Sequence, residues 1–472
     1  MKINIITLGC SKNTVDSENL AARLKAQGHT VCFDGQHDRA TTHSRTHTIK
    51  FDAVIINTCG FIGDAKEESI NTVLQQVALL KQSHNHTIKQ SKLIVCGCLV
   101  ERYHDELAKE IPEVDAWYGV HEWEKIAQDL GTNNPIGTIG TIDTIGTIKN
   151  RPLSTPSHYA YLKIAEGCNR SCSYCAIPLI RGAHRSRPID DIVAEAKALV
   201  AGGVKELIVI SQDTTWYGLD LYHKRALGEL LERLATESGA PWIRLHYTYP
   251  SSFPEDAIDA IARHANICNY IDIPLQHINS RILSSMQRGI DREGTLRLLD
   301  TFRAKLPDAA IRTTLIVGYP GETEKEFEEL KDFVREARFD RMGCFAYSPE
   351  EGTPAESLGD PVPDEEKQRR VDELMAIQEQ ISFEKNQARI GKTYRCIIDR
   401  TEGDFLVGRT QYDSPEVDDE VLINTNELTD TLTQSHINAT TAPAPGDFVD
   451  VCITDATEHD LMGRLVIPDC LR

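Results

Sequence analysis

Three cysteines in one short segment constrain this chain more than any other feature of its sequence. Cys168, Cys172 and Cys175 follow the spacing Cys-x3-Cys-x2-Cys. Three thiolates on one loop can bind three irons of a four-iron cluster and leave the fourth iron open to a small molecule. A structural zinc site usually takes four ligands in two separated pairs, and the nearest further candidate is His184. The spacing therefore favours an iron-sulfur cluster with an open iron, and a zinc loop is the alternative.

The residues around this motif are similar to those of the radical S-adenosylmethionine (SAM) enzymes. An apolar run, Tyr159–Ile164, precedes the cysteines, and Ala176–Pro178 follows them. In that family the open iron binds SAM. One electron from the cluster splits SAM into methionine and a 5′-deoxyadenosyl radical. The cluster and SAM thus generate the radical, and the protein holds and orients them. The resemblance assigns no catalytic residue beyond the cluster ligands. It implies SAM contacts at Tyr174, Gln212, Asp213 and Gly318, although Gln212-Asp213 stands where the family usually has Gly-Gly-Glu.

Strand-like apolar runs alternate with helical patterns after the motif. With Tyr159–Ile164 there are six such runs, the others being Leu207–Ser211, Trp242–Tyr247, Tyr270–Ile273, Ile311–Val317 and Met342–Tyr347. Alternating strands and helices predict a parallel sheet, and the family version is an open (β/α)6 partial barrel. Functional loops should lie at the carboxyl ends of the strands. The cysteine loop, Gln212-Asp213 and Gly318–Glu322 all follow strands in this way.

A second set of cysteines lies nearer the amino terminus. Cys10, Cys59 and Cys98 follow the apolar runs Ile3–Leu8, Val54–Asn57 and Leu93–Val95, and the helical patterns Thr14–Gln27, Asp64–Leu80 and Arg102–Lys109 come next. Repeated strand-helix units form a parallel sheet whose strand-to-helix loops open on one edge. We therefore expect these three cysteines to lie together. A buried free cysteine is otherwise most often a small apolar core residue.

The segments that carry this second set resemble the amino-terminal domain of the methylthiotransferases. They are Thr7–Glu18, Asn57–Ser69 and Gly97–Tyr103. The resemblance implies that Cys10, Cys59 and Cys98 bind an auxiliary 4Fe-4S cluster, in addition to the radical-SAM 4Fe-4S cluster at Cys168, Cys172 and Cys175. Cys96 lies within an apolar run, so we interpret it as core. Cys32, Cys268, Cys344, Cys396, Cys452 and Cys470 match no cluster motif and are read as ordinary thiols.

The chain divides into three expected domains and a linker. Its 472 residues suffice for about three domains. The predicted segments are an amino-terminal parallel α/β domain over 1–135, a linker over 136–153, the radical-SAM domain over 154–388 and a small β-barrel over 391–472. Triplets ending in Thr-Ile at 137–148 indicate the linker, and the histidine-rich stretches Gln36–Thr48 and His84–His86 are read as solvated loops. By its position, the last domain resembles the TRAM domain found at the carboxy terminus of these enzymes.

The last domain is strongly acidic. Residues 391–472 hold 6 Lys and Arg against 16 Asp and Glu, a net charge of −10 within a whole-chain charge of −20. Nucleic-acid binding relies on basic side chains that neutralise phosphates, so an acidic barrel favours a basic protein as partner. Acidic surfaces also simply keep proteins in solution. Nucleic acid is therefore an unfavoured direct substrate.

Further motifs resemble the methylthiotransferase branch that modifies ribosomal protein S12. They are Tyr161–Gly167, Ile271–His277, Arg312–Gly318 and Tyr347–Thr353, and the transfer-RNA branch typically differs from Gly60-Phe-Ile62 after its second auxiliary cysteine. The resemblance implies conversion of an aspartate β-carbon C–H in S12 into C–S–CH3, with two 4Fe-4S clusters and SAM. The alternatives are methylthiolation of a modified adenosine in transfer RNA, and a non-catalytic iron-sulfur carrier or redox scaffold.

Partners and compartment follow from the same interpretation. The expected partners are S12, free or on the small ribosomal subunit, and an electron donor such as flavodoxin or ferredoxin. The thirteen cysteines come without the layout of a secretory signal. No run approaches the roughly 18 apolar residues of a membrane helix. We therefore expect a cytoplasmic protein that does not span a membrane.

Overall fold

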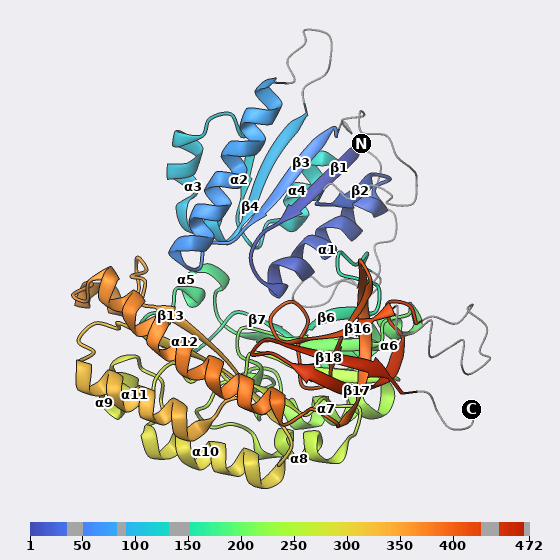
Figure 1. The fold of residues 1–472 in the computed structure, drawn as a ribbon. Coiled ribbons are helices and arrows are strands. Elements are labelled where there is room, and N and C mark those ends of the chain that lie inside the picture. The colour runs from blue at the N-terminus through green and yellow to red at the C-terminus, as the bar shows by residue number, and fades with distance from the viewer. Residues whose placement is uncertain (35–50, 83–90, 132–150, 426–442, 467–472) are drawn as a thin grey trace, which may run out of the picture.

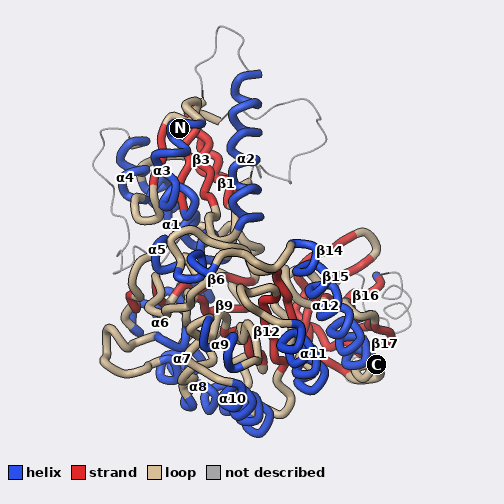
Figure 2. The backbone as a smooth tube through the Cα atoms, turned by 90° about the vertical axis from the view of Figure 1, so that its left-hand side faces the viewer, coloured by secondary structure: helices blue, strands red, loops and turns tan. Residues whose placement is uncertain are grey.

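The structure, a computed structural model, describes residues 1–34, 51–82, 91–131, 151–425 and 443–466 (Figure 1). Most of the predicted linker, both histidine-rich stretches and Cys470 lie outside these residues. No helix in the described part of the chain is long and apolar enough to cross a membrane. The first domain lies at one end of the molecule, and the carboxy-terminal barrel flanks the central domain (Figures 1 and 2).

A five-stranded parallel sheet in the order β2-β1-β3-β4-β5 forms the first domain. Its strands are β1 (Lys2–Thr7), β2 (Thr30–Phe33), β3 (Ala53–Thr58), β4 (Lys92–Gly97) and β5 (Ala116–Tyr118), and its helices are α1 (Ser11–Ala26), α2 (Gly63–Gln82), α3 (Cys98–Glu110) and α4 (Trp123–Leu130). Both faces of the sheet are covered, as parallel sheets require. Ile55 packs with side chains of α1 and α4, whereas Val54 and Ile56 pack with side chains of α2 and α3. This confirms the predicted parallel α/β domain.

Six parallel strands and their helices form the central domain. The strands are β6 (Tyr159–Lys163), β9 (Glu206–Ile210), β10 (Trp242–Leu245), β11 (Tyr270–Asp272), β12 (Ala310–Val317) and β13 (Arg341–Ala346). They pair as β6-β9-β10 and β11-β12-β13. Contacts between β10 and β11 join the two sheets. The domain is therefore the predicted open partial barrel.

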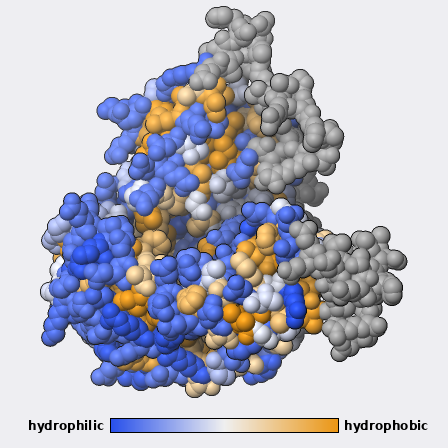
Figure 3. Space-filling view, in the orientation of Figure 1, coloured by the Kyte–Doolittle hydropathy of each residue, from blue (hydrophilic) through white to orange (hydrophobic). Residues whose placement is uncertain are grey.

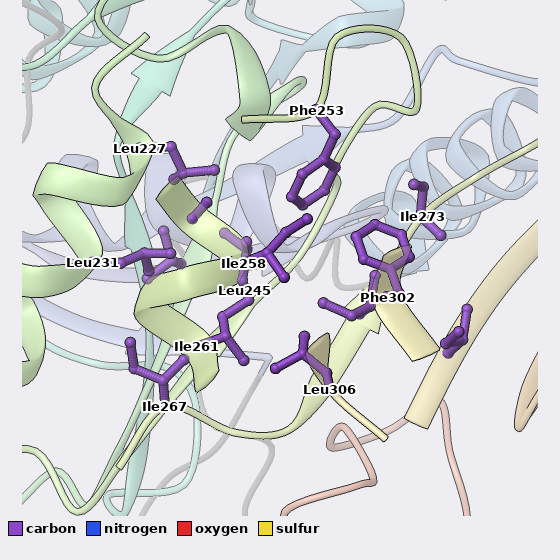
Figure 4. Close-up of a cluster of buried hydrophobic side chains, with 14 of the residues drawn as sticks. Leu227, Leu231, Leu245, Phe253, Ile258, Ile261, Ile267, Ile273, Phe302 and Leu306 are labelled. Carbon is purple, nitrogen blue, oxygen red and sulfur yellow. The ribbon is translucent and has the colours of Figure 1, made fainter. Parts of the chain in front are cut away.

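The remaining elements of the central domain are helices, short helical turns and one small hairpin. They are β7 (Ala165–Glu166), α5 (Ile177–Arg181), β8 (Arg185–Ser186), α6 (Ile189–Ala201), η1 (Thr214–Trp216), α7 (Leu227–Glu237), α8 (Glu255–Arg263), α9 (Ser280–Ser285), α10 (Arg292–Lys305), α11 (Glu324–Ala337), η2 (Pro354–Leu358) and α12 (Asp364–Gln387). Leu231, Ile258 and Phe302, from α7, α8 and α10, pack with Leu245 of β10 (Figure 4). This apolar layer holds the helices against the strands. Hydrophilic side chains cover the side of the molecule where α11 and α12 lie (Figure 3).

A closed five-stranded barrel in the order β14-β15-β16-β18-β17 ends the described chain. Its strands are β14 (Thr393–Glu402), β15 (Phe405–Thr410), β16 (Glu420–Asn424), β17 (Phe448–Ala456) and β18 (Asp460–Leu465). The barrel contacts the amino-terminal ends of the central strands: Phe448 packs edge-on against Trp242 with ring centroids 4.9 Å apart. Glu206 forms buried ion pairs with Arg244 and with Arg409 of the barrel. The predicted small β-barrel is therefore present, and it lies at the strand ends opposite the cysteine loop.

Candidate functional site

The sheet of the first domain brings Cys10, Cys59 and Cys98 to one edge. Cys10 directly precedes α1, Cys59 follows β3, and Cys98 is the first residue of α3. The preceding strands β1, β3 and β4 are neighbours in the sheet, and parallel strands end on the same side. The helical pattern predicted α3 only from Arg102, whereas the helix begins at Cys98. Two of the three cysteines thus stand at the start of a helix, where the helix dipole favours a thiolate.

The three thiols are close enough to affect one another. Burial, together with the proximity of Cys10 and Cys98, raises the pKa of Cys59 to about 12. The Oδ1 atom of Asn13 lies 4.0 Å from the sulfur of Cys10 and 3.8 Å from that of Cys98. Metal ligands must be deprotonated, so a cationic group has to be present for the buried thiols of Cys59 and Cys98 to act as ligands.

An arginine from the central domain closes this group of cysteines. Arg181, at the end of α5, donates from Nη2 to the Cys98 sulfur over 3.3 Å and to Asn13 Oδ1 over 2.6 Å. Its Nη1 pairs with Asp16 over 2.6 Å. The structure thus directs Arg181 to the auxiliary cysteines, a contact that no sequence motif indicated.

The second cysteine set lies on the loop that follows β7. Cys168 and Cys172 are buried, and Cys175 is partly buried. Burial raises the pKa of Cys175 to about 12, with Cys172 adding to the shift. The backbone N–H of Arg170 lies 3.4 Å from the Cys168 sulfur. Arg288 donates to the Cys172 sulfur over 3.3 Å. Sequence patterns gave no sign of Arg288, because it lies far along the chain.

The spacing of the sulfur atoms distinguishes between the two metal hypotheses. In the described part of the chain, neither cysteine set brings three ligand atoms within 4.8 Å of one another. Ligands about 2.3 Å from a single tetrahedral zinc would lie about 3.8 Å apart. A cluster spreads its cysteine ligands over several irons. Three thiols that are not gathered this closely therefore fit a cluster better than one zinc ion.

The structure positions two of the predicted SAM contacts, Gln212 and Asp213, within polar networks. Gln212 donates to Glu166 over 2.7 Å, and its buried Oε1 has no hydrogen-bond partner among the described residues. That free acceptor suits a ligand with N–H groups. Asp213 accepts from Arg170 over 2.7 Å and from the backbone N–H of Thr215 over 2.9 Å. A SAM contact at Asp213 would have to share its carboxylate with these donors.

A further predicted SAM contact, which follows β12, is a glycine with a positive φ. Gly318 has a φ of +71°, and a Cβ on it would lie 2.4 Å from Cγ of Lys367. Its N–H donates to the carboxylate of Glu322. The visible role of Gly318 is thus a tight turn after β12. Its contact with SAM stays a prediction.

A cavity of about 710 Å³ separates the loop after Cys59 from the radical-SAM loop. Phe61–Asp64 line it from the first domain, and Tyr174 lines it from the central domain. Two further lining residues, Gln276 and Tyr347, have buried oxygens, Oε1 and OH, without a hydrogen-bond partner among the described residues. Gln276 also has a φ of +74°, a strained conformation that clusters at functional sites. Both residues lie in segments that carry the family resemblance, Ile271–His277 and Tyr347–Thr353, but no sequence pattern assigned either of them a role.

One edge of the cavity is closed by a buried ion pair between the domains. Glu350, which follows β13 and lines the cavity, pairs with Arg102 of α3 over 2.6 Å and with Lys66 of α2 over 3.0 Å. The side chain of Glu350 is only 2 % exposed. Breaking a buried pair by removing one partner is strongly destabilising. This contact therefore fixes the first domain to the central domain at the edge of the cavity.

The other cysteines occupy varied positions. Cys96 is fully buried in the core between the sheet and α1 and α4, and its pKa is raised by that burial. Cys32, Cys268 and Cys396 are buried as well. Cys344 and Cys452 are partly buried, and Cys344 lines the cavity. The interpretation of Cys96 as a core residue is therefore confirmed.

Comparison with protein families supports the three-domain organisation. The model of the Radical SAM superfamily matches residues 162–334. The model described as Uncharacterized protein family UPF0004 matches residues 2–119, and that of the TRAM domain matches residues 390–466. Both cysteine sets lie within the first two of these matches.

Individual relatives extend the similarity over nearly the whole chain. The ribosomal protein uS12 methylthiotransferase RimO of Flavobacterium johnsoniae is 51 % identical over 463 residues, covering 98 % of each chain. The protein of the same name from Phocaeicola vulgatus is 48 % identical, covering 98 % of this chain and 99 % of the relative. The fold resembles that of the radical SAM methyltransferase TsrM from Kitasatospora setae, at a TM-score of 0.50 and 14 % identity over 73 % and 72 % of the two chains. The chain belongs to the family of ribosomal protein uS12 methylthiotransferases.

Proposed function

We propose that this enzyme methylthiolates ribosomal protein uS12, converting an aspartate β-carbon C–H into C–S–CH3. The observation that carries the proposal is a cavity lined by residues next to both cysteine sets. Phe61–Asp64, which follow Cys59, line it, and so does Tyr174, which lies between Cys172 and Cys175. A substrate side chain in this cavity would lie beside both loops that carry the proposed ligands.

The chain's own residues hold, orient and enclose the reacting groups. Cys168, Cys172 and Cys175 would bind the radical-SAM cluster, and a second cluster would occupy the set formed by Cys10, Cys59 and Cys98. Bound there, SAM and the two clusters would supply the one-electron chemistry and the sulfur that the transfer needs. Tyr174, Gln212, Asp213 and Gly318 are the proposed SAM contacts. The free Oε1 of Gln212 would accept a hydrogen bond from the SAM amino group.

Three carboxylates in the cavity wall are neutralised by ion pairs. Glu350 pairs with Arg102 and Lys66, and Lys367, which also lines the cavity, pairs with Asp360 and Asp364. Phe345, another lining residue, is 52 % exposed and offers an apolar contact to a substrate. The choice of uS12 over transfer RNA therefore rests on the relatives named as uS12 methylthiotransferases.

The remaining parts of the proposal concern partners and compartment. A small reductant protein such as flavodoxin or ferredoxin would deliver the electron, and uS12 would be modified free or on the small ribosomal subunit. The cytoplasm remains the predicted compartment.

Mass spectrometry of the product tests the proposed activity. The reconstituted enzyme, with SAM and a reductant, should add one methylthio group to one aspartate of uS12. Methylthiolation of transfer RNA and not of uS12 would contradict the substrate assignment. Release of no 5′-deoxyadenosine from SAM would favour a non-catalytic iron-sulfur carrier.

Cysteine variants test the two cluster sites. The anaerobically reconstituted protein should contain about eight irons, four per cluster. Replacing Cys168, Cys172 and Cys175 by Ala should remove half of the iron and abolish SAM cleavage. Replacing Cys10, Cys59 and Cys98 should remove the other half and spare SAM cleavage. The control Cys96→Ala should keep all the iron, and full iron content in the Cys10, Cys59 and Cys98 variant would disprove the auxiliary site.

A further inference from the structure

Each of the two cysteine sets is contacted by one buried arginine. Arg181 donates to the Cys98 sulfur, and Arg288 donates to the Cys172 sulfur, in both cases over 3.3 Å. Both arginines are 3 % exposed. They come from different parts of the chain, so the structure repeats the same contact at two independent sites.

The guanidinium of Arg181 is held in place by three other groups. Asn13 and Asp16, both on α1, accept from it over 2.6 Å. Glu166 accepts over 3.4 Å, and it lies two residues before Cys168. With these partners fixed, the donor to Cys98 cannot turn away without breaking an ion pair.

The guanidinium of Arg288 is fixed just as firmly. It donates to the OH of Tyr174 over 3.2 Å and to the carbonyl of Pro274. It also stacks over the ring of Tyr249, with its Cζ 4.1 Å from the ring centroid. Tyr249 in turn places its OH 3.4 Å from the Cys172 sulfur. The two donors therefore act on separate cysteines through separate supports.

A permanent positive charge beside a ligand sulfur has a predictable effect on a cluster. Arginine stays protonated in proteins, and hydrogen bonds to cluster sulfurs together with net charge set the reduction potential. The reduced cluster carries one more negative charge than the oxidised cluster. An N–H donor on a ligand sulfur stabilises that reduced state, so it raises the potential.

We propose that Arg181 and Arg288 are positioning residues that set the reduction potentials of the two clusters independently, Arg181 at the auxiliary site and Arg288 at the radical-SAM site. This inference rests on the proposed function, because it requires a cluster at each cysteine set. The chain could therefore set the reduction potentials of two clusters of the same type separately.

Redox titration of single clusters tests this assignment. The full-length chain with Cys168, Cys172 and Cys175 replaced by Ala would carry the auxiliary cluster alone, and the chain with Cys10, Cys59 and Cys98 replaced would carry the other. Arg181→Gln and Arg288→Gln are each introduced into both backgrounds. The potential is read by electron paramagnetic resonance during stepwise reduction, and iron content is measured in parallel.

The expected pattern is a pair of reciprocal shifts. Arg181→Gln should lower the auxiliary potential and leave the other unchanged, and Arg288→Gln should do the reverse. A shift of roughly tenfold in the ratio of reduced to oxidised cluster, about 59 mV for one electron, is expected for each. Unchanged potentials in variants that keep their iron would overturn the proposal.

A matched control separates this role from general support of the fold. Arg187 is also buried. It pairs with Glu195 over 2.6 Å and donates to the carbonyl of Lys163, whose ammonium group pairs with Asp16 as Arg181 does, so it belongs to the same buried charge network. Arg187→Gln should leave both potentials unchanged. If it shifts the auxiliary potential as much as Arg181→Gln does, the effect belongs to the buried charge network and the proposal fails.

A second substitution keeps the test decisive if Arg181→Gln loses its cluster. Arg181→Lys keeps the charge but cannot reach Cys98, Asn13 and Asp16 together. A loaded Arg181→Lys protein with the wild-type potential would overturn the proposal, and one with a lowered potential would support it. If both Arg181 variants lose auxiliary iron while Arg187→Gln keeps it, the positioning role is supported; if all three lose it, the role is refuted. Absence of auxiliary iron from the parent chain would instead refute the proposed function.

Discussion

Individual side chains beside the cysteines come from distant parts of the sequence. Asn13 lies near both Cys10 and Cys98, and Arg181 reaches Cys98 from the other domain. Buried thiols resist losing their protons, as the raised pKa of Cys59 shows. Bound iron must therefore supply the positive charge that keeps them deprotonated, with Arg181 assisting. Loading the cluster should release protons.

A glycine next to a ligand offers a residue-level test of the auxiliary site. Gly97 has a φ of +103°, and a Cβ on it would lie 2.5 Å from Asn57 Oδ1 and 2.6 Å from the carbonyl oxygen of Thr58. Gly97→Ala should therefore displace Cys98 and remove the auxiliary half of the iron. Iron analysis of the reconstituted protein measures this.

The matched control for this change is a glycine of similar conformation in open space. Gly28 has a φ of +85° with nothing within 4 Å of its Cβ position. Gly28→Ala should cost about 1 kcal/mol of stability and keep all the iron. Equal iron in the Gly97 and Gly28 variants would show that close packing at Gly97 does not fix Cys98.

At the level of elements, the barrel is joined to the central strands by buried polar contacts. His246, just after β10, lies with Nε2 3.0 Å from the hydroxyl oxygen of Ser414, which lies between β15 and β16. Asp418 accepts from Tyr270 over 2.6 Å. These contacts require specific protonation states, so the junction between the barrel and the central strands should respond to pH.

The buried histidine predicts the direction of that response. Burial lowers the pKa of His246 to about 3, whereas an unfolded histidine titrates near pH 6.5. Between these values the unfolded state binds the extra proton, so stability is full above about pH 6.5 and falls as the pH decreases, by about 1.4 kcal/mol per pH unit. His246→Gln should flatten this slope in unfolding experiments between pH 7 and 5. The control His121→Gln, which changes an exposed histidine, should leave the slope unchanged. Equal slopes in the wild-type, His246→Gln and His121→Gln proteins would exclude His246 as the cause.

The elements were predictable from the sequence to different degrees. Strands such as β3 and β9 follow from apolar runs, because burial on both faces leaves few polar residues in them. The parallel pairing of β16 with β18 was not predictable, because register between distant strands depends on the closed barrel. The contact of Arg181 with Cys98 was equally hidden, since it depends on how two domains pack. The sequence motif nevertheless identified all six proposed ligands.

At the scale of the whole molecule, the acidity of the last domain is only partly exposed. Asp413 and Asp419 pair with Arg341 over 2.6 and 2.8 Å, and Asp418 pairs with Arg312 over 3.3 Å. These carboxylates neutralise arginines of the central domain and cannot attract a partner. The net charge of −10 therefore overstates the field outside the barrel. Deleting the barrel would also expose buried arginines, so point substitutions test recruitment better.

Substrate recruitment should depend on the exposed acids of the barrel. Replacing Asp404, Asp450 and Asp455 by Asn should slow association with uS12 on the order of tenfold at low salt and flatten its salt dependence. Stopped-flow or surface-binding kinetics at several salt concentrations measure this.

The control removes equally exposed acids from the central domain. Asp190, Glu255 and Glu293 have side chains 85, 79 and 82 % exposed. Their replacement by Asn or Gln should have a smaller effect on association with uS12. Identical salt slopes for the two triple variants would mean that total charge, and not the barrel surface, attracts the substrate.

The position of Arg181 also bears on the order in which the protein is made. The three auxiliary cysteines belong to the first 98 residues, and domains commonly fold during synthesis from the amino terminus. Their guanidinium partner, however, is encoded only six residues after Cys175. A nascent chain paused before that point would present three thiols without Arg181. The auxiliary site is thus completed only by the stretch of translation that also produces the second cysteine set.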